Sequence, residues 1–163
     1  MVMFSGSELT QTAVNIERNG IAFYTTLAKR SRDPKAKRTF SELADMERQH
    51  EKTFSVMLDS AEKETHFEEY TGQHASYLKA LADSAVFTDA VMAAEAARRV
   101  SDQAEALRLA IEAEKDSILF YMEMRGVSRE KDRTTIGHII DEEKAHLVQL
   151  REMLHNTTQG KPL

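Results

Sequence analysis

The sequence predicts an all-α protein, an antiparallel four-helix bundle made of two helical hairpins that are joined by a long, partly helical crossover. Helix breakers are scarce, with six Gly and two Pro among 163 residues, and Ala, Leu, Glu, Lys and Arg are frequent. No run of β-branched residues alternates with polar ones as in a strand. The chain also repeats itself, because AVNIERNGIAFY at 13–24 returns as AIEAEKDSILFY at 110–121.

Four long helices are expected, over about 7–30, 34–61, 101–125 and 128–155. Ser7 is a candidate N-cap of the first helix, and Asp33-Pro34 has the cap-then-proline order that opens the second. Gly126 is expected to end the third. Short turns make consecutive helices antiparallel neighbours, so the hairpins span about 7–61 and 101–155. The crossover covers about 62–100, and the whole chain, 1–163, is expected to form a single domain.

Composition excludes several kinds of function. The sequence contains no Cys, so it has neither disulfides nor thiolate metal sites. Its net charge is −5 and its Lys and Arg are scattered, which argues against nucleic-acid binding. No apolar run approaches the roughly 20 residues that span a bilayer, so no membrane partner is expected. The first residues lack the pattern of a secretory signal, and a cytoplasmic location is expected.

Each helix has an apolar inward stripe that is interrupted in its middle by acidic residues. The first and third helices each contribute one Glu, and the second and fourth helices each contribute Glu-x-x-His. Residues three apart lie on one helix face, so the Glu and His of each motif can reach the same metal ion. The predicted ligands are Glu17, Glu47, His50, Glu114, Glu143 and His146.

The charge of these residues is the reason to expect metal. Four carboxylates cannot remain ionised in one core without partners, and no Lys or Arg occupies the middle of these stripes. Two divalent cations about 3.5–4 Å apart would neutralise them. The alternative is a core layer of hydrogen-bonded Glu and His without metal, which is tolerated only when every member finds a partner.

Two points of the ligand assignment have more than one candidate residue. Glu142 stands four residues before His146 and Glu143 three, and the match to the spacing of Glu47 and His50 selects Glu143. A third Glu-x-x-His, formed by Glu152 and His155, lies near the expected helix end and is interpreted as solvated surface.

Other residues on the stripes are candidates for supporting roles. Tyr24 and Tyr121 each follow a ligand Glu by two helical turns, and their hydroxyls are expected to orient a carboxylate; the alternative is an ordinary core aromatic. Gly20 and Ser117 lie one turn from the ligand Glu, where small residues either leave a pocket for a diatomic oxidant or let helices approach.

At these motifs the chain resembles the ferritin-like superfamily and, more narrowly, the di-iron domain of rubrerythrins. The resemblance covers nearly the whole chain and rests on IERNGIAFY, MERQHEKTF, IEAEKDSILFY and IIDEEKAHLVQL. It implies the same six ligands, two iron ions (with a manganese or mixed pair as the alternative) and an oxidoreductase that reduces hydrogen peroxide or oxygen. Alternatives are a ferroxidase that handles iron, a di-metal hydroxylase, a manganese catalase, or a non-catalytic bundle that binds a partner.

Two departures from the family pattern are visible. Rubrerythrins carry a further Glu three residues after the ligand of the third helix, and this sequence has Ser117 there. They usually also carry a four-cysteine rubredoxin domain that delivers electrons, whereas this sequence has no Cys. The resemblance therefore implies a small oxidant and an external electron donor as partners, and we expect a homodimer or another small homo-oligomer.

Overall fold

The computed structural model describes residues 3–62, 69–71 and 73–159. Within these ranges the chain forms six helices and two short strands. In order they are β1 (Met3–Ser5), α1 (Gly6–Arg30), α2 (Pro34–Glu62), β2 (Glu69–Thr71), α3 (Gln73–Ser84), α4 (Ala90–Arg99), α5 (Gln103–Val127) and α6 (Glu130–Gln159). Part of the predicted crossover, residues 63–68 and 72, lies outside the described residues.

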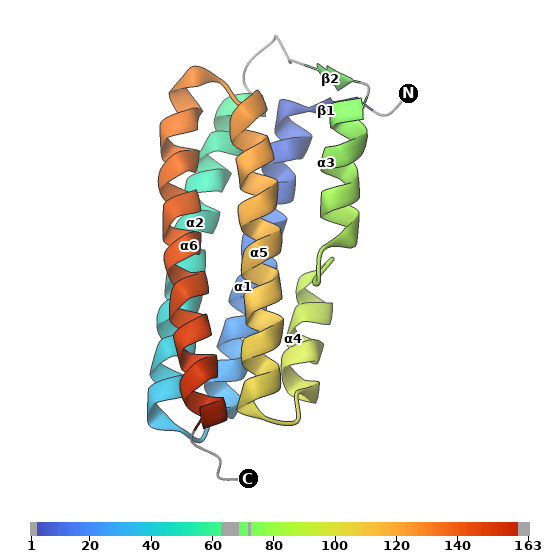
Figure 1. Ribbon diagram of the computed structural model, residues 1–163. Coiled ribbons are helices and arrows are strands. Elements are labelled where there is room, and N and C mark those ends of the chain that lie inside the picture. Colours follow the sequence, from blue (N-terminus) through green and yellow to red (C-terminus); the bar gives the residue numbers. More distant parts are fainter. Residues whose placement is uncertain (1–2, 63–68, 72, 160–163) are drawn as a thin grey trace.

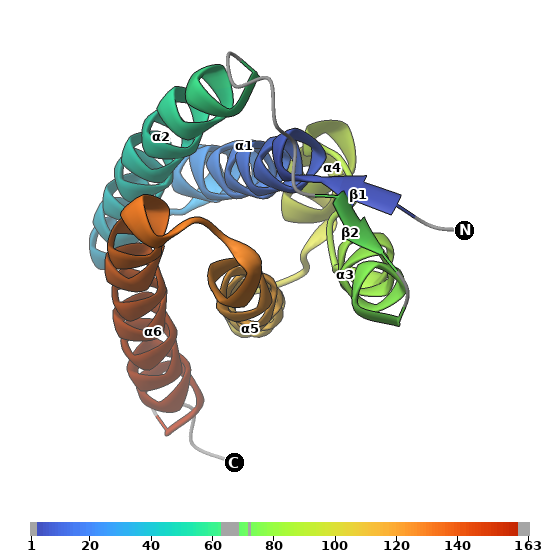
Figure 2. The ribbon, with the colours of Figure 1, turned by 90° about the horizontal axis from the view of Figure 1, so that it is seen from above.

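The four long helices form the predicted all-α, four-helix bundle. Figure 1 shows α1, α2, α5 and α6 running along one common direction, with α1–α2 and α5–α6 as the two antiparallel hairpins. The crossover helices α3 and α4 follow one another along the outside of α5 and α1 (Figures 1 and 2). The crossover therefore carries the chain from the end of the bundle where α2 stops to the end where α5 begins.

The first hairpin begins earlier than predicted. Ser5, not Ser7, is the N-cap of α1, because its Oγ accepts a hydrogen bond from the Glu8 N–H at 3.2 Å while the Glu8 carboxylate accepts one from the Ser5 N–H at 2.8 Å. Ser5 thus has the Glu three residues on that a capping box requires. The predicted cap of α2 is confirmed, since the Asp33 carboxylate accepts from the Ala36 N–H at 3.1 Å.

In the second hairpin the turn lies later in the sequence than predicted, and the last helix extends further. Helix α5 continues through Val127, so the expectation that Gly126 ends it is wrong. Gly126 does not adopt the left-handed conformation in which glycine terminates helices, and the C-cap is Ser128. Helix α6 begins at Glu130 and extends beyond His155 to Gln159.

A small antiparallel pairing of β1 with β2 was not predicted. Met3 pairs with Thr71 and Ser5 with Glu69, so the segment before α1 is joined to the segment before α3. Three residues are too few to produce a recognisable alternation of polar and apolar positions. The pairing leaves the all-α class of the protein unchanged.

The bundle core consists of two apolar clusters on either side of a polar layer. One cluster includes Leu9, Phe54 and Ile136, and the other includes Phe40, Leu107 and Leu150. The layer between them contains the acidic residues and histidines that interrupt the helix stripes. None of the helices within the described residues has an apolar stretch long enough to cross a membrane.

Candidate metal centre

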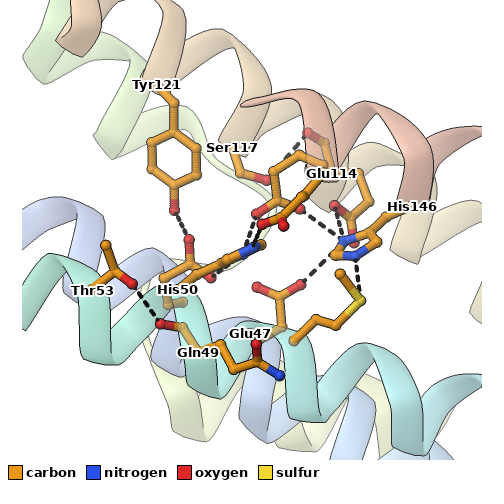
Figure 3. A network of polar contacts seen from close by, with 12 residues as sticks. Glu47, Gln49, His50, Thr53, Glu114, Ser117, Tyr121 and His146 are labelled. Carbon is orange, nitrogen blue, oxygen red and sulfur yellow. Dashed lines mark hydrogen bonds and ion pairs between the residues drawn. The ribbon is translucent and has the colours of Figure 1, made fainter. Parts of the chain in front are cut away.

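The structure brings all six predicted ligand residues together in the polar layer. Each is at most 5% exposed, and the four bundle helices all contribute. Figure 3 shows the side chains of Glu47, His50, Glu114 and His146 converging on one another. The set, called the Glu–His cluster below, is Glu17 on α1, Glu47 and His50 on α2, Glu114 on α5, and Glu143 and His146 on α6.

The cluster divides into two overlapping groups that could each hold a metal ion. One group combines Glu17 and His50 with Glu47 and Glu143, and the other combines Glu114 and His146 with the same two residues. Within each group the candidate ligand atoms all lie within 4.8 Å of one another. Glu47 and Glu143 belong to both groups, so these two carboxylates would be shared if both groups held an ion, as in two-metal sites.

The hydrogen bonding of the cluster also fits bound cations. Glu17 Oε2 and Glu114 Oε2 are fully buried and have no hydrogen-bond partner. A buried carboxylate oxygen without a partner is costly, and a metal ion would provide the missing interaction. These two oxygens belong to the two glutamates that are unique to one group each. The nearest histidine Nδ1 lies 3.6 Å from Glu17 Oε2 and 3.7 Å from Glu114 Oε2, too far for a hydrogen bond.

Each histidine turns one ring nitrogen inward and the other outward. The Nδ1 atoms of His50 and His146 lie 3.1 and 3.0 Å from the two oxygens of Glu143. Outside the cluster, His50 Nε2 lies 2.7 Å from Glu142 Oε2. The Glu142 side chain is 52% exposed and that of Glu143 only 1%, so the structure places Glu143, not Glu142, inside the cluster.

Two tyrosines connect the hairpins crosswise. The Tyr121 hydroxyl on α5 donates to Glu17 Oε1 on α1 at 2.5 Å, and the Tyr24 hydroxyl on α1 donates to Glu114 Oε1 on α5. Both rings are buried. Each hydroxyl occupies one carboxylate oxygen and leaves the other, unpartnered oxygen directed to the cluster, which is the orienting role considered for these residues.

A cavity of about 40 Å³ adjoins the cluster between α1, α5 and the link from α3 to α4. Gly20 and Ser117 line it together with Glu47 and Glu114. The absence of a side chain at Gly20 also permits close approach, because a Cβ there would lie 3.1 Å from Glu47 Oε2. The cavity can hold roughly two or three water-sized molecules, so it suits a very small ligand.

Two residues that the sequence analysis did not single out hold the wall of this cavity. Asn19 Nδ2 donates to the Phe87 carbonyl at 3.0 Å, and the Asp116 carboxylate accepts from the Val86 N–H at 2.8 Å. Both therefore fix the link between α3 and α4. They occupy matching places in the sequence repeat, two residues after Glu17 and Glu114, and this recurrence of a short polar side chain was the signal that could have revealed them.

A model of the rubrerythrin family matches residues 8–154. The chain belongs to the rubrerythrin family. A crystal structure described as a ferritin-like diiron-carboxylate protein, from Thermotoga maritima, is similar at 31% sequence identity with a TM-score of 0.75. The match covers 96% of this chain and 99% of that one. A comparison with curated proteins gives no match. The family and the buried cluster together suggest a di-metal site.

The departure from the rubrerythrin pattern at Ser117 has a direct structural consequence. The Ser117 hydroxyl donates to the carbonyl of Ala113 at 2.9 Å within its own helix. Because residue 117 is a serine, it contributes no carboxylate to the cluster, and its small side chain forms part of the cavity wall. In this rubrerythrin-family protein the two candidate ligand groups consist of the six residues that the repeat defines.

Without metal, burial and mutual repulsion both disfavour ionisation of most of the glutamates in the cluster. Burial raises the pKa of Glu17 and of Glu47 well above the ordinary value, and neighbouring carboxylates raise it further for Glu47; burial and Glu143 raise that of Glu114 to about 8. Burial also opposes the ionisation of Glu143, but hydrogen bonds from both histidines outweigh it and lower its pKa.

The pKa values of both histidines are raised, although burial alone would lower them. Burial disfavours their charged forms, yet hydrogen bonds and the charges of the carboxylates raise the pKa of His50 to about 9 and that of His146 to about 10. The metal-free cluster therefore holds protons that two divalent ions would displace, because metal ligands must be deprotonated.

Proposed function

We propose that this protein is a di-iron oxidoreductase that reduces hydrogen peroxide or oxygen. The observation that carries the proposal is the pair of ligand groups sharing Glu47 and Glu143 beside a small cavity. Carboxylate-rich ligand sets stabilise ferric iron, and imidazole suits iron as well. The rubrerythrin family and the diiron-carboxylate description of the similar crystal structure support iron rather than another metal.

The residues would divide between two ions according to the two groups. Glu17 and His50 would hold one ion, Glu114 and His146 the other, and Glu47 and Glu143 both. When bound, the iron pair supplies two electrons, one from each ion as it passes from the ferrous to the ferric state.

The protein's own groups would position the oxidant and manage protons. The cavity beside Gly20 and Ser117 has room for a small oxidant. Reduction of one hydrogen peroxide to two waters consumes two electrons and two protons. The hydrogen-bonded pair of His50 and Glu142 is a polar connection from the buried cluster to solvent. The chain has no Cys, so an external donor would restore the electrons.

Elemental analysis of protein purified without added metal tests the first part of the proposal. We expect two iron ions per chain, whereas manganese would favour a catalase. Size-exclusion chromatography accompanies this measurement. A small homo-oligomer is expected, and a large cage-like assembly would favour iron storage with ferroxidase activity.

The reaction is tested on protein loaded anaerobically with ferrous iron. One equivalent of hydrogen peroxide should oxidise two ferrous ions, followed by absorbance, and a chemical reductant should restore them for another cycle. Glu143→Ala is the control without a functional cluster. If iron-loaded protein leaves both peroxide and oxygen unreacted, the oxidoreductase proposal is wrong.

A further inference from the structure

The two halves of the Glu–His cluster differ at the matched position directly before each shared Glu. Met46 immediately precedes Glu47, and Glu142 immediately precedes Glu143, so the two occupy equivalent places in the sequence repeat. Each lies against the histidine of the other hairpin. Glu142 Oε2 is 2.7 Å from His50 Nε2, and Met46 Sδ is 3.2 Å from His146 Nε2. Figure 3 shows the contact of His146 with this sulfur.

The hydrogen bonds of the candidate ligands themselves match closely between the two halves. Each half has one Glu that accepts from a tyrosine of the other hairpin and keeps one oxygen unpartnered. Both histidines direct Nδ1 toward Glu143, and both halves share Glu47 and Glu143. The difference between carboxylate and thioether is therefore the clearest asymmetry around the candidate ligands.

This asymmetry should affect how strongly each histidine binds a metal ion. If Nδ1 held a metal ion, Nε2 would carry the hydrogen and donate it outward. A carboxylate acceptor fixes this tautomer and increases the basicity of the ligand nitrogen, whereas a thioether is only a weak acceptor. Glu142 also adds negative charge near the ion bound by Glu17 and His50. Its partial exposure screens that charge, but the 2.7 Å hydrogen bond remains.

We propose that the two metal positions are inequivalent, and that the position of Glu17 and His50 binds a divalent ion more tightly than that of Glu114 and His146. Glu142 is the positioning residue that makes the difference. The inference rests on the di-metal site of the proposed function, but it does not depend on which oxidant the protein reduces.

Titration of metal-free protein with Co²⁺ against a competing chelator tests the inference, with visible absorbance as the readout. Wild-type protein should bind two ions in two resolved steps. Glu142→Gln keeps the shape of the side chain but removes its charge, and it should weaken the tighter step roughly 10- to 100-fold. Asp141→Asn removes the same charge from the neighbouring exposed residue, which pairs with Lys144, and should leave both steps unchanged.

Two further variants locate the effect. Met46→Glu supplies the missing carboxylate to His146 and should tighten the weaker step by a similar factor, while Met46→Leu should leave the tighter step unchanged. In a Glu17→Gln background, where the tighter position has lost a ligand, Glu142→Gln should have little additional effect. Circular dichroism confirms that each variant is folded.

The outcomes separate this inference from the proposed function. If Glu142→Gln binds both ions as wild-type protein does, or if it weakens the two steps equally, the inference is overturned. If wild-type protein binds no pair of ions, the di-metal site itself fails. If the two steps behave as expected but iron-loaded protein does not react with peroxide or oxygen, only the oxidoreductase proposal falls.

Discussion

The hydroxyl of Tyr121 on α5 donates a hydrogen bond of 2.5 Å to Glu17 Oε1 on α1, inside the fully buried centre of the bundle. The bond joins the two hairpins through a candidate metal ligand. The Tyr24 hydroxyl repeats the arrangement in the reverse direction, with Glu114 as its acceptor. Each half of the cluster is therefore oriented by a residue of the opposite hairpin.

Replacing this hydroxyl should affect both stability and metal binding. Tyr121→Phe leaves Glu17 Oε1 without a donor, and a lost bond to a buried carboxylate costs about 1.5–3 kcal/mol. We expect a loss of that order in the unfolding free energy of the metal-loaded protein, measured in urea, together with weaker binding of one ion. Tyr77→Phe is the matched control, because Tyr77 is 44% exposed and lies outside the cluster. Equal effects of the two substitutions would contradict the orienting role.

The number of ions bound should depend on which carboxylate is removed. Glu143 belongs to both ligand groups and Glu17 to one, so Glu143→Ala should lose both ions and Glu17→Ala only one. Elemental analysis after dialysis measures the difference. Glu143→Ala should also destabilise the metal-free bundle, since His50 and His146 both lose an acceptor. Retention of two ions by Glu143→Ala would show that the ligand groups are assigned wrongly.

The bundle and its six inward ligands could be predicted because they depend on features within single helices. Glu17 stands on an apolar stripe and Glu47 precedes His50 by three residues. Both features can be recognised in the sequence without knowing how the helices pack. The repeat then placed the four stripes at one depth. The expectation of a metal site then followed from the charge of the four inward glutamates, since buried carboxylates require compensation.

The contacts that surround the ligands depend on how helices are rotated and staggered against one another. The sequence placed Glu142 and Met46 next to ligands, but only the packing of α2 against α6 sets each of them against the histidine of the other hairpin. The links from Asn19 and Asp116 likewise depend on the path of the α3–α4 segment over α1 and α5. Such partners lie far apart in sequence, where periodicity carries no information.

Metal-free protein should lose stability as the pH rises. The folded-state pKa of Glu114 is raised to about 8 and those of His50 and His146 to about 9 and 10, whereas the ordinary values are 4.5 and 6.5. Protonation of these groups therefore favours the folded state, and their contribution, complete at low pH, disappears as the pH passes through the raised values. The lowered pKa of Glu143 acts in reverse and removes stability only in acid.

Metal binding should respond to pH in the opposite direction, because the ligands must release their protons before they bind an ion. The melting temperature of metal-loaded protein should therefore exceed that of metal-free protein by a margin that widens from pH 6 to pH 9. Thermal unfolding with and without a chelator across this range measures the margin. A margin that is constant or shrinks with rising pH would count against a cluster that exchanges protons for metal.

Substitution of Gly20 should separate helix stability from metal binding. Alanine is favoured over glycine in a helix interior by about 1 kcal/mol, so Gly20→Ala gains helix stability. Its Cβ would lie 3.1 Å from Glu47 Oε2, however, and must displace that carboxylate. We expect metal-free protein to be as stable as wild type or more so, with both ions bound more weakly, because Glu47 is shared. Gly137→Ala should not weaken binding, because the atoms nearest to its Cβ, from 3.4 Å, belong to the flexible end of Arg125.

The cavity beside the cluster should control the entry of the oxidant. Ala85 lines the cavity from the α3–α4 link, away from the ligands, so Ala85→Leu should narrow it while two ions still bind. We expect slower oxidation of ferrous protein by hydrogen peroxide and slower binding of azide to the ferric protein, both followed by stopped-flow absorbance. Ser84→Leu adds the same side chain at the neighbouring exposed residue, which does not line the cavity. If Ala85→Leu and Ser84→Leu react at the wild-type rate with both molecules, the oxidant reaches the cluster by another route.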